Sequence, residues 1–520
     1  MTSVSKPSRG AMAARTSRSA RTRSSGRSAA GSQSTSPAAD ASFHKSASDG
    51  NGARAFVRVY RQGLGDCILV RVKRTNDDDF KLLIDCGVVL GTEGAVDAMT
   101  RVVENLVHDT DQKVDVIAIT HEHWDHLSGF IQAKDSFKKL TAASVWVAWT
   151  EDPNDDLANT LRDELGKAAK NLAACATALH AAGDPATSDM LADIALMPFG
   201  AAASSNTSTR AALDDVKGMA KLRICRPTDK PFEIPGAKAR IYVLGPPHDP
   251  KLIRKINPST SSPETYALAP NGAGALSRGV IQALDSREKA GDPAAPILDD
   301  PMAPFHQRVT IPLGQKGRPW PPDSRAINEK DWRKIDDFFR EHYAGSDTSQ
   351  SEDWRRIDGD WLGSAAELAL ALQSYTNNTS LVLALELGEA GEGDVLLFAA
   401  DAQVGNWESW QTWQCEVNGR TVTGPDILKR TIFYKVGHHG SHNATLKEHG
   451  VDQMEALKFA IIPVDEQEAK KKHWGRMPLP DLIAALENKR PPVVVLRTDL
   501  EPPNPPAQAA VTNDYFELRL

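Results

Sequence analysis

The segment HEHWDH, residues 121–126, places three imidazoles and a carboxylate on a short stretch of chain that follows an apolar, strand-like run. In extended chain just past a strand end, His121 and His123 point the same way and can share one ion. Where the chain turns helical, Asp125 and His126 can face a second ion. Imidazole nitrogen and carboxylate oxygen both suit zinc, iron or manganese. The segment therefore predicts a metal site at the end of a strand.

The same segment differs from the HExxH motif of zinc proteases, because residue 125 is Asp rather than His. The alternative is a set of histidines that bind no metal. That alternative requires this spacing to arise by chance among the 14 histidines of 520 residues. We therefore expect metal ligands here.

Strand-like runs separated by turn-forming residues continue on both sides of the segment. They cover residues 56–60, 66–72, 80–85, 115–120, 144–149, 239–244, 380–385, 395–400, 432–436, 459–462, 493–497 and 515–518. A leucine stripe predicts a helix over residues 157–180. Residues 198–222 and 250–330 are rich in Pro, Gly, Ser and Asp and are expected to be surface insertions. Strands interleaved with helices predict an α/β layered domain.

The motif HEHWDH resembles the HxHxDH signature of the metallo-β-lactamase superfamily. Five further stretches resemble one branch, which includes the C-terminal domain of competence-type DNA-uptake channel proteins: GLGDC (63–67), LIDCG (83–87), NTSLVL (378–383), LFAADA (397–402) and KVGHHGS (435–441). The resemblance implies a four-layer αββα sandwich, with the metals at one edge and a large insertion. It also divides the chain into a tail (1–50), an N-terminal half-domain (51–150), an insertion or lid with helices, one core strand and loops (151–375), and a C-terminal half-domain (376–520).

The resemblance also assigns roles to individual residues. It implies that His121 and His123 bind the first metal, that Asp125 and His126 bind the second, and that Asp401 bridges the two. The alternative for Asp401 alone is a helix N-cap.

The pair His438-His439 is expected to supply one imidazole to the first metal and one to the substrate, because adjacent side chains diverge. The alternative for this pair is an ordinary turn. Asp85 is expected to hold the histidine loop by hydrogen bonds, or else to serve only as a turn residue. The branch has a further histidine where this chain has Met477, so the second site is expected to be incomplete unless His473 substitutes.

Two divalent ions lower the pKa of a shared water and supply a hydroxide at neutral pH. The resemblance therefore implies a hydrolase of EC class 3 with a binuclear site, holding zinc first and manganese or iron next. Its expected catalytic groups are Asp125, His438 and His439. The expected substrate is a small-molecule or nucleic-acid phosphodiester. The alternatives are an ester, thioester or lactone substrate, a non-catalytic scaffold that binds a partner, and a flavin-coupled di-iron oxidoreductase.

Composition limits the other possibilities. The net charge is −7, yet residues 1–39 hold seven basic residues and no acidic one. The acidic remainder is unlike a dedicated nucleic-acid-binding module. Five cysteines without paired short spacing argue against a disulfide framework and predict a reducing, cytoplasmic location. No run approaches the roughly 18 apolar residues of a membrane span, so no membrane partner is expected.

Two features remain open on sequence grounds. Residues 1–50 are rich in Ser, Ala, Arg, Thr and Gly and are expected to be a disordered tail that touches polyanions, with an organellar transit peptide as the alternative. Seven tryptophans in or near the insertion either stack on substrate bases or, as composition favours, pack in the core. They are Trp146, Trp149, Trp332, Trp354, Trp361, Trp407 and Trp410.

Overall fold

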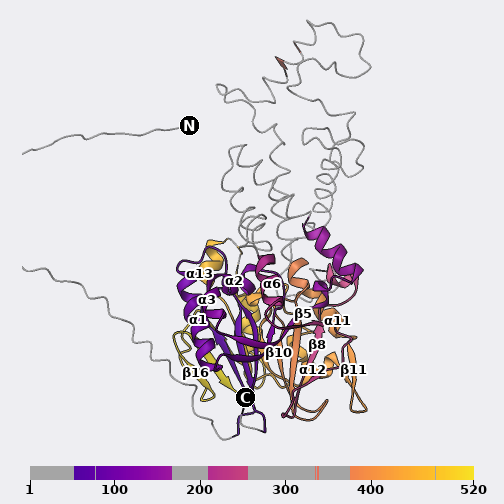
Figure 1. Cartoon of the computed structure of the whole chain (residues 1–520). Helices are drawn as coiled ribbons and strands as arrows, with labels where there is room; N and C mark the ends of the chain where they lie inside the picture. Colours follow the sequence, from indigo (N-terminus) through magenta and orange to yellow (C-terminus); the bar gives the residue numbers. More distant parts are fainter. Residues whose placement is uncertain are drawn as a thin grey trace, which may run out of the picture. The chain divides into compact units, whose positions relative to one another are not determined.

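Two mixed β-sheets carry the fold (Figure 1). The first has the order β16-β17-β1-β2-β3-β4-β5-β6, with β1 (Ala55–Tyr60), β2 (Cys67–Val72), β3 (Phe80–Cys86), β4 (Lys113–Ala118), β5 (Thr141–Ala148), β6 (Lys221–Cys225), β16 (Ala509–Val511) and β17 (Tyr515–Arg519). The second has the order β15-β14-β13-β10-β9-β8-β7, with β7 (Phe232–Glu233), β8 (Ala239–Gly245), β9 (Val382–Leu387), β10 (Asp394–Phe398), β13 (Thr431–Lys435), β14 (Phe459–Ile462) and β15 (Val494–Arg497). A separate hairpin pairs β11 (Gln414–Val417) with β12 (Arg420–Thr423).

Each sheet is parallel in one half and antiparallel in the other. Strands β3 to β6 run parallel, as do β10, β13, β14 and β15. The carboxyl ends of parallel neighbours lie at the same edge of their sheet, which is where ligand sites form in mixed α/β folds. This edge is therefore where the residues of the candidate site are expected to meet.

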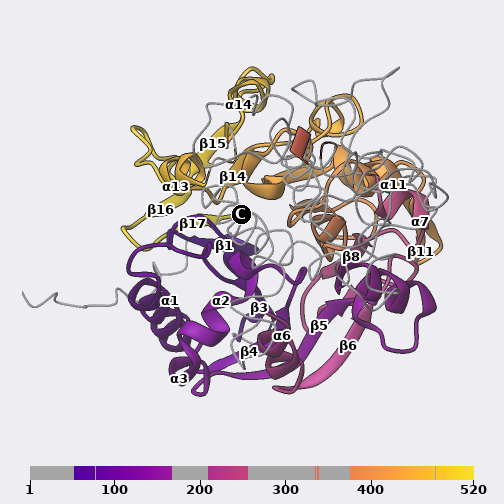
Figure 2. The same cartoon turned by 90° about the horizontal axis from the view of Figure 1, so that it is seen from above.

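Helices cover the outer face of each sheet (Figure 2). Helices α1, α2, α3 and α6 contribute to one apolar cluster with the first sheet, and α11, α12, α13 and α14 to another with the second. The helical elements are α1 (Ala95–Asp109), α2 (Trp124–Gln132), α3 (Lys134–Phe137), α6 (Thr209–Lys217), α7 (Pro250–Ile253), α11 (Val404–Trp410), α12 (Gly424–Lys429), α13 (Glu466–Lys471), α14 (Pro480–Glu487) and the 3₁₀ turns η1 (Trp149–Glu151), η4 (Gly437–Gly440) and η5 (Val451–Gln453). The expected αββα sandwich is confirmed.

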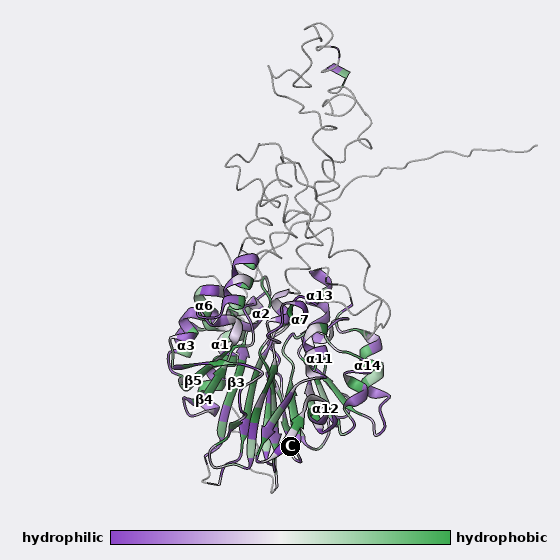
Figure 3. Ribbon diagram, turned by 90° about the vertical axis from the view of Figure 1, so that its right-hand side faces the viewer, coloured by the Kyte–Doolittle hydropathy of each residue, from purple (hydrophilic) through white to green (hydrophobic). Residues whose placement is uncertain are grey.

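The alternation of side chains along the strands explains the layers. In β3, Leu82 and Ile84 join the core between the two sheets, whereas Leu83 joins the cluster under the helices. In β10, Leu396 and Leu397 divide in the same way. Because successive strand residues point to opposite faces, a strand covered on both faces must be apolar throughout. Figure 3 shows the resulting hydrophobic strands beneath more hydrophilic helices.

The computed structural model describes residues 52–75, 78–166, 209–255, 334, 337–338, 375–472, 474 and 476–520. Several expectations lie outside this part of the chain: the tail, residues 167–180 of the predicted helix, almost all of 250–330, His473, Trp332, Trp354 and Trp361. Residues 157–166 of the predicted helix are helical. The division of the chain into domains stays a prediction.

Two expectations about the middle of the chain are wrong. Part of 198–222 was expected to be a surface insertion, but α6 packs Leu213 and Val216 into the apolar cluster of the first sheet, and β6 pairs with β5. The region 151–375 was expected to give one core strand, yet β6, β7 and β8 all belong to the two sheets. Both errors arise from short elements whose apolar residues are too few to stand out from polar neighbours.

Four of the tryptophans are fully buried, namely Trp146, Trp149, Trp407 and Trp410. For these four, core packing is the correct interpretation, rather than a stacking platform. Within the described ranges, no helix has both the length and the apolar composition that crossing a bilayer requires.

Candidate metal centre

The predicted site residues meet where strands of the two sheets end. Asp85 lies near the end of β3, and the histidine segment follows β4. Asp401 follows β10, and the pair His438-His439 follows β13. Since β3 and β4 are parallel, as are β10 and β13, each sheet brings two loops to the same edge.

Two glycines allow the loops of the first sheet to lie backbone against backbone. A Cβ on Gly87 would lie 2.5 Å from the carbonyl carbon of Asp125, and a Cβ on Gly65 would lie 2.7 Å from its carbonyl oxygen. Gly65 also has a φ of 149°, a backbone conformation that residues with a side chain rarely adopt. The close approach lets Asp66 N–H donate to the carbonyl of Asp125 at 3.0 Å. These glycines explain the GLGDC and LIDCG stretches.

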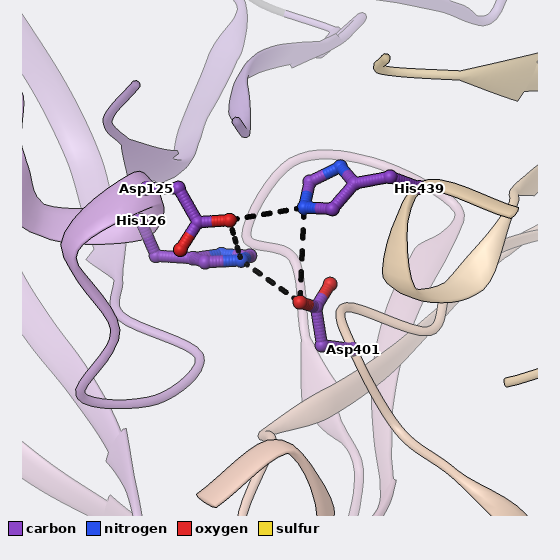
Figure 4. A group of neighbouring side chains, drawn as sticks. All are labelled: Asp125, His126, Asp401 and His439. Atoms are coloured by element: carbon purple, nitrogen blue, oxygen red, sulfur yellow. Dashed lines mark hydrogen bonds and ion pairs between the residues drawn. The ribbon is translucent and has the colours of Figure 1, made fainter. Parts of the chain in front are cut away.

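One group of donors contains Asp125, His126, Asp401 and His439, all buried (Figure 4). Asp401 Oδ2 lies 3.3 Å from His126 Nε2 and 3.8 Å from His439 Nε2. Asp125 Oδ2 lies 3.1 Å from His439 Nε2 and 3.7 Å from His126 Nε2. Two imidazoles and two carboxylates from both sheets therefore surround one point, and this donor set suits zinc.

A second group contains His121, His123 and the same Asp401. His121 Nε2 lies 2.9 Å from His123 Nδ1 and 3.9 Å from Asp401 Oδ2. The two histidines present nitrogens to one point, and Asp401 belongs to both groups. The geometry places His121 with His123, and Asp125 with His126; the assignment of each group to a metal stays a prediction.

Two imidazole nitrogens have no hydrogen-bond partner among the described residues, although both are buried: His123 Nε2 and His126 Nε2. An unpaired buried polar atom is costly, by roughly 1–3 kcal/mol. His123 Nε2 has a lone pair that can coordinate a cation, and His126 Nε2 gains one when its proton leaves. The residues present therefore fit a divalent ion.

The ring orientations are fixed by hydrogen bonds at the opposite nitrogens. His126 Nδ1–H donates to Asp85 Oδ2 at 2.8 Å, and His439 Nδ1–H donates to the carbonyl of Pro463 at 2.6 Å. These bonds leave Nε2 of each ring directed at Asp401. Asp85 also accepts from Thr120 N–H at 2.8 Å and from its hydroxyl at 2.6 Å. Asp85 thus has the contacts expected of a residue that holds the histidine loop.

Backbone strain is concentrated at this edge of the sandwich. Among the described residues, seven non-glycine positions have a positive φ, and four of them lie here: Asp85, Ala400, His438 and His439. Such conformations cost of order 1–3 kcal/mol each and persist where the surroundings enforce them. Ala400, where the related branch has glycine, adopts a φ of 49°, and its carbonyl accepts from His438 N–H at 3.0 Å. An alanine therefore forms the turn that positions Asp401.

The two histidines of the HHGS stretch occupy different places. His439 is fully buried and groups with Asp125 and His126, not with the first pair of histidines as expected. His438 is 12% exposed, lies 4.0 Å from Asp401 Oδ2, and contacts Ser441 Oγ at 2.8 Å. The two rings thus lie in different surroundings, His439 within the donor group and His438 at its edge.

Position 477 does not take part in the centre. Met477 is buried in the apolar cluster between the second sheet and its helices. His439 completes the group around Asp125 and His126, so that group has four donors without a histidine at 477. The expected gap at the second site therefore has no counterpart in this geometry.

Asp66 and Lys435 also lie at the site, although their sequence positions alone did not identify them as site residues. Lys435 Nζ lies 2.5 Å from Asp66 Oδ2 and 3.4 Å from Asp401 Oδ1, and all three side chains are buried. Asp66 also groups with Asp85 and His126. Asp66 lies in the GLGDC stretch and Lys435 in the KVGHHGS stretch. Their positions in these two motifs could have identified them as site residues.

Residues 60–145 match the family model of the metallo-beta-lactamase superfamily. Neither curated proteins nor solved structures give a match to the chain. The matched residues include the HEHWDH segment and Asp85 but neither Asp401 nor His439, which the fold brings to the same edge. A metallo-beta-lactamase superfamily domain and these donor groups together suggest a metal-dependent hydrolase.

The pKa shifts divide the imidazoles of this centre into two kinds. Burial lowers the pKa of His123 to about 4 and that of His438 to about 4, and it lowers the pKa of His121 well below its usual value. These rings are neutral and able to coordinate. For His126 and His439, burial opposes protonation, but the negative charges of Asp401 and Asp125 outweigh it and raise the pKa.

The carboxylates show the converse effect. Burial alone would raise the pKa of Asp401 and of Asp125, but the neighbouring His126 and His439 lower both below the usual range. In the metal-free protein these acids are therefore ionised and are balanced by protonated imidazoles and Lys435.

Zinc binding is expected to release protons, because the metal must displace those that the neighbouring carboxylates favour on His126 and His439. Since the pKa of both rings is raised, they are protonated below that pKa, and zinc affinity should increase with pH. Isothermal titration of the metal-depleted chain in buffers of different ionisation enthalpy measures the proton count. Heats that are identical in every buffer would contradict this assignment.

Proposed function

We propose that the protein is a metal-dependent hydrolase of phosphodiesters, with His121, His123, Asp125, His126, Asp401 and His439 as metal ligands. The observation that carries the proposal is the convergence of these donors from both sheets, with two buried imidazole nitrogens that accept or donate no hydrogen bond within the described ranges. The ligand types favour zinc first and manganese or iron next. The resemblance to the DNA-uptake branch supports a phosphodiester over other anionic transition states, and a reducing, cytoplasmic location remains part of the proposal.

The residues of the chain have separate tasks in such a reaction. Divalent ions bound here would lower the pKa of a water molecule and offset the negative charge that develops on the phosphoryl oxygens. Asp85 and the Pro463 carbonyl fix the His126 and His439 rings. His438, neutral and partly exposed beside Asp401, stands where it can exchange a proton with the leaving group.

The test compares hydrolysis of bis(p-nitrophenyl) phosphate and of single- and double-stranded DNA by the full chain, with zinc, manganese or magnesium. We expect metal-dependent hydrolysis of at least one of these, and its loss in the His121→Ala/His123→Ala variant. The matched control is His108→Ala, which removes an imidazole that is 48% exposed on α1.

The other outcomes separate the alternatives. Bound zinc without phosphodiester turnover would overturn the substrate class and direct attention to esters, thioesters and lactones. Neither turnover nor bound metal would overturn the enzyme and favour a scaffold that binds a partner.

A further inference from the structure

A cavity of about 350 Å³ lies beside the candidate metal centre. Glu122 lines it and stands between His121 and His123 in the chain. Thr376 and Thr379 line it as well. The cavity and the metal centre therefore share the histidine loop as a common wall.

The segment before β9 forms a second common wall. Asn377, next to Thr376, places its Nδ2 3.2 Å from His438 Nε2. Ser380, next to Thr379, places its Oγ 3.3 Å from His121 Nδ1. If the scissile bond of a substrate lies at the metal centre, the adjoining part of the same substrate can therefore occupy the cavity.

Glu122 presents an unsatisfied acceptor. Its Oε2 accepts from Arg210 Nη1 at 3.1 Å, and Arg210 also bonds to Glu151 at 2.9 Å. The other oxygen, Oε1, is buried and has no hydrogen-bond partner among the described residues. Since a buried acceptor without a donor is costly, a ligand with a hydroxyl group would satisfy it.

Arg162, also in the cavity wall, supplies a positive charge. Its guanidinium donates to the carbonyls of Thr150 and Asp152 and to the side-chain oxygen of Asn159. Across the ranges that the structure describes, it makes no ion pair with a carboxylate. A guanidinium has five N–H donors, so donors and charge remain for an anionic group.

We propose that this cavity binds the sugar-phosphate unit adjoining the scissile bond, with a sugar hydroxyl donating to Glu122 Oε1 and an anionic oxygen accepting from Arg162. The proposal rests on the proposed function for the presence of a phosphate. The volume lies at the lower end of the roughly 300–1,000 Å³ of ligand sites, which fits one such unit. Leu161 and Leu165, also in the wall, offer an apolar surface for a base.

The experiment is isothermal titration of the zinc-loaded full chain with ribose 5-phosphate, AMP and inorganic phosphate. We expect ribose 5-phosphate to bind at least about tenfold more tightly than inorganic phosphate, because a hydrogen bond to a charged group contributes about that factor. Glu122→Gln and Arg162→Gln are each expected to weaken ribose 5-phosphate about tenfold. AMP binding more tightly than ribose 5-phosphate identifies a nucleotide as the source of the unit, and equal affinities identify a sugar phosphate without a base.

The control is Arg101→Gln, which removes the same charge from an exposed position on α1. Zinc content and circular dichroism check that each variant is folded and loaded with metal. If Glu122→Gln loses metal, Arg162→Gln still tests the inference, because Arg162 lies outside the histidine loop. The inference is overturned if the wild-type chain binds ribose 5-phosphate no more tightly than inorganic phosphate. It is also overturned if the affinity of both variants for ribose 5-phosphate stays within twofold of the wild-type value. Turnover of bis(p-nitrophenyl) phosphate, measured alongside, tests the proposed function separately.

Discussion

Replacing Asp401 with asparagine is expected to lower the rate of hydrolysis about 1,000-fold, equivalent to ~4 kcal/mol of transition-state stabilisation. Asp401 is the one residue shared by both donor groups, and its Oδ2 faces His126 at 3.3 Å and His121 at 3.9 Å. An amide lacks the negative charge with which a carboxylate would offset bound metal. The measurement is kcat/KM on the best phosphodiester substrate, together with bound metal by elemental analysis.

The matched control is Asp135→Asn, at a side chain that is 94% exposed. It removes the same charge without touching the centre and should leave kcat/KM unchanged. A full complement of metal and a loss of less than tenfold in Asp401→Asn would show that Asp401 does not bridge the two groups.

Replacing Lys435 with methionine is expected to lower the free energy of unfolding by about 3 kcal/mol, because removing one partner strands a buried charge. The Lys435 ammonium is fully enclosed and pairs with Asp66 at 2.5 Å. Burial opposes its charge, yet Asp66 and Asp401 raise its pKa above the usual value, so it stays protonated. Urea unfolding of the metal-depleted chain at pH 7 measures the loss.

Two further variants test the cause. Lys134→Met breaks an exposed pair with Asp215, 2.7 Å long, and should cost less than about 1 kcal/mol. Lys435→Met/Asp66→Asn should recover part of the stability, because it removes the stranded carboxylate. If the double variant is less stable than Lys435→Met alone, the loss comes from packing and not from the unpaired charge.

Much of the fold could be predicted because buried strands leave a direct trace in the sequence. Runs such as residues 115–120 and 459–462 are apolar on both faces, and these runs coincide with or overlap β4 and β14. Helix α1 was not predicted. Its stripe of Met99, Val102, Val103 and Leu106 is regular, but the residue before it is Gly94, with no side-chain cap to signal a start.

The candidate site could be predicted in composition but not in arrangement. The HEHWDH segment specifies its donors locally, since a strand end followed by a helix fixes the directions of neighbouring side chains. The allocation of His438 and His439 depends on two successive left-handed residues, with φ of 44° and 52°, which no local pattern of side chains indicates. The pairing of Asp66 with Lys435 joins the two sheets and is visible only once they pack together.

The division of the donors between two sheets has a consequence for the whole domain. Asp125 and His126 follow a strand of one sheet, and Asp401 and His439 follow strands of the other, with 274 residues between His126 and Asp401. An ion held by all four residues would cross-link the two halves of the sandwich. Unfolding of either half would then require the ion to dissociate. Free metal then adds to stability in proportion to the logarithm of its concentration. The concentration of free metal in the cell would in this way contribute to the free energy of unfolding of the domain.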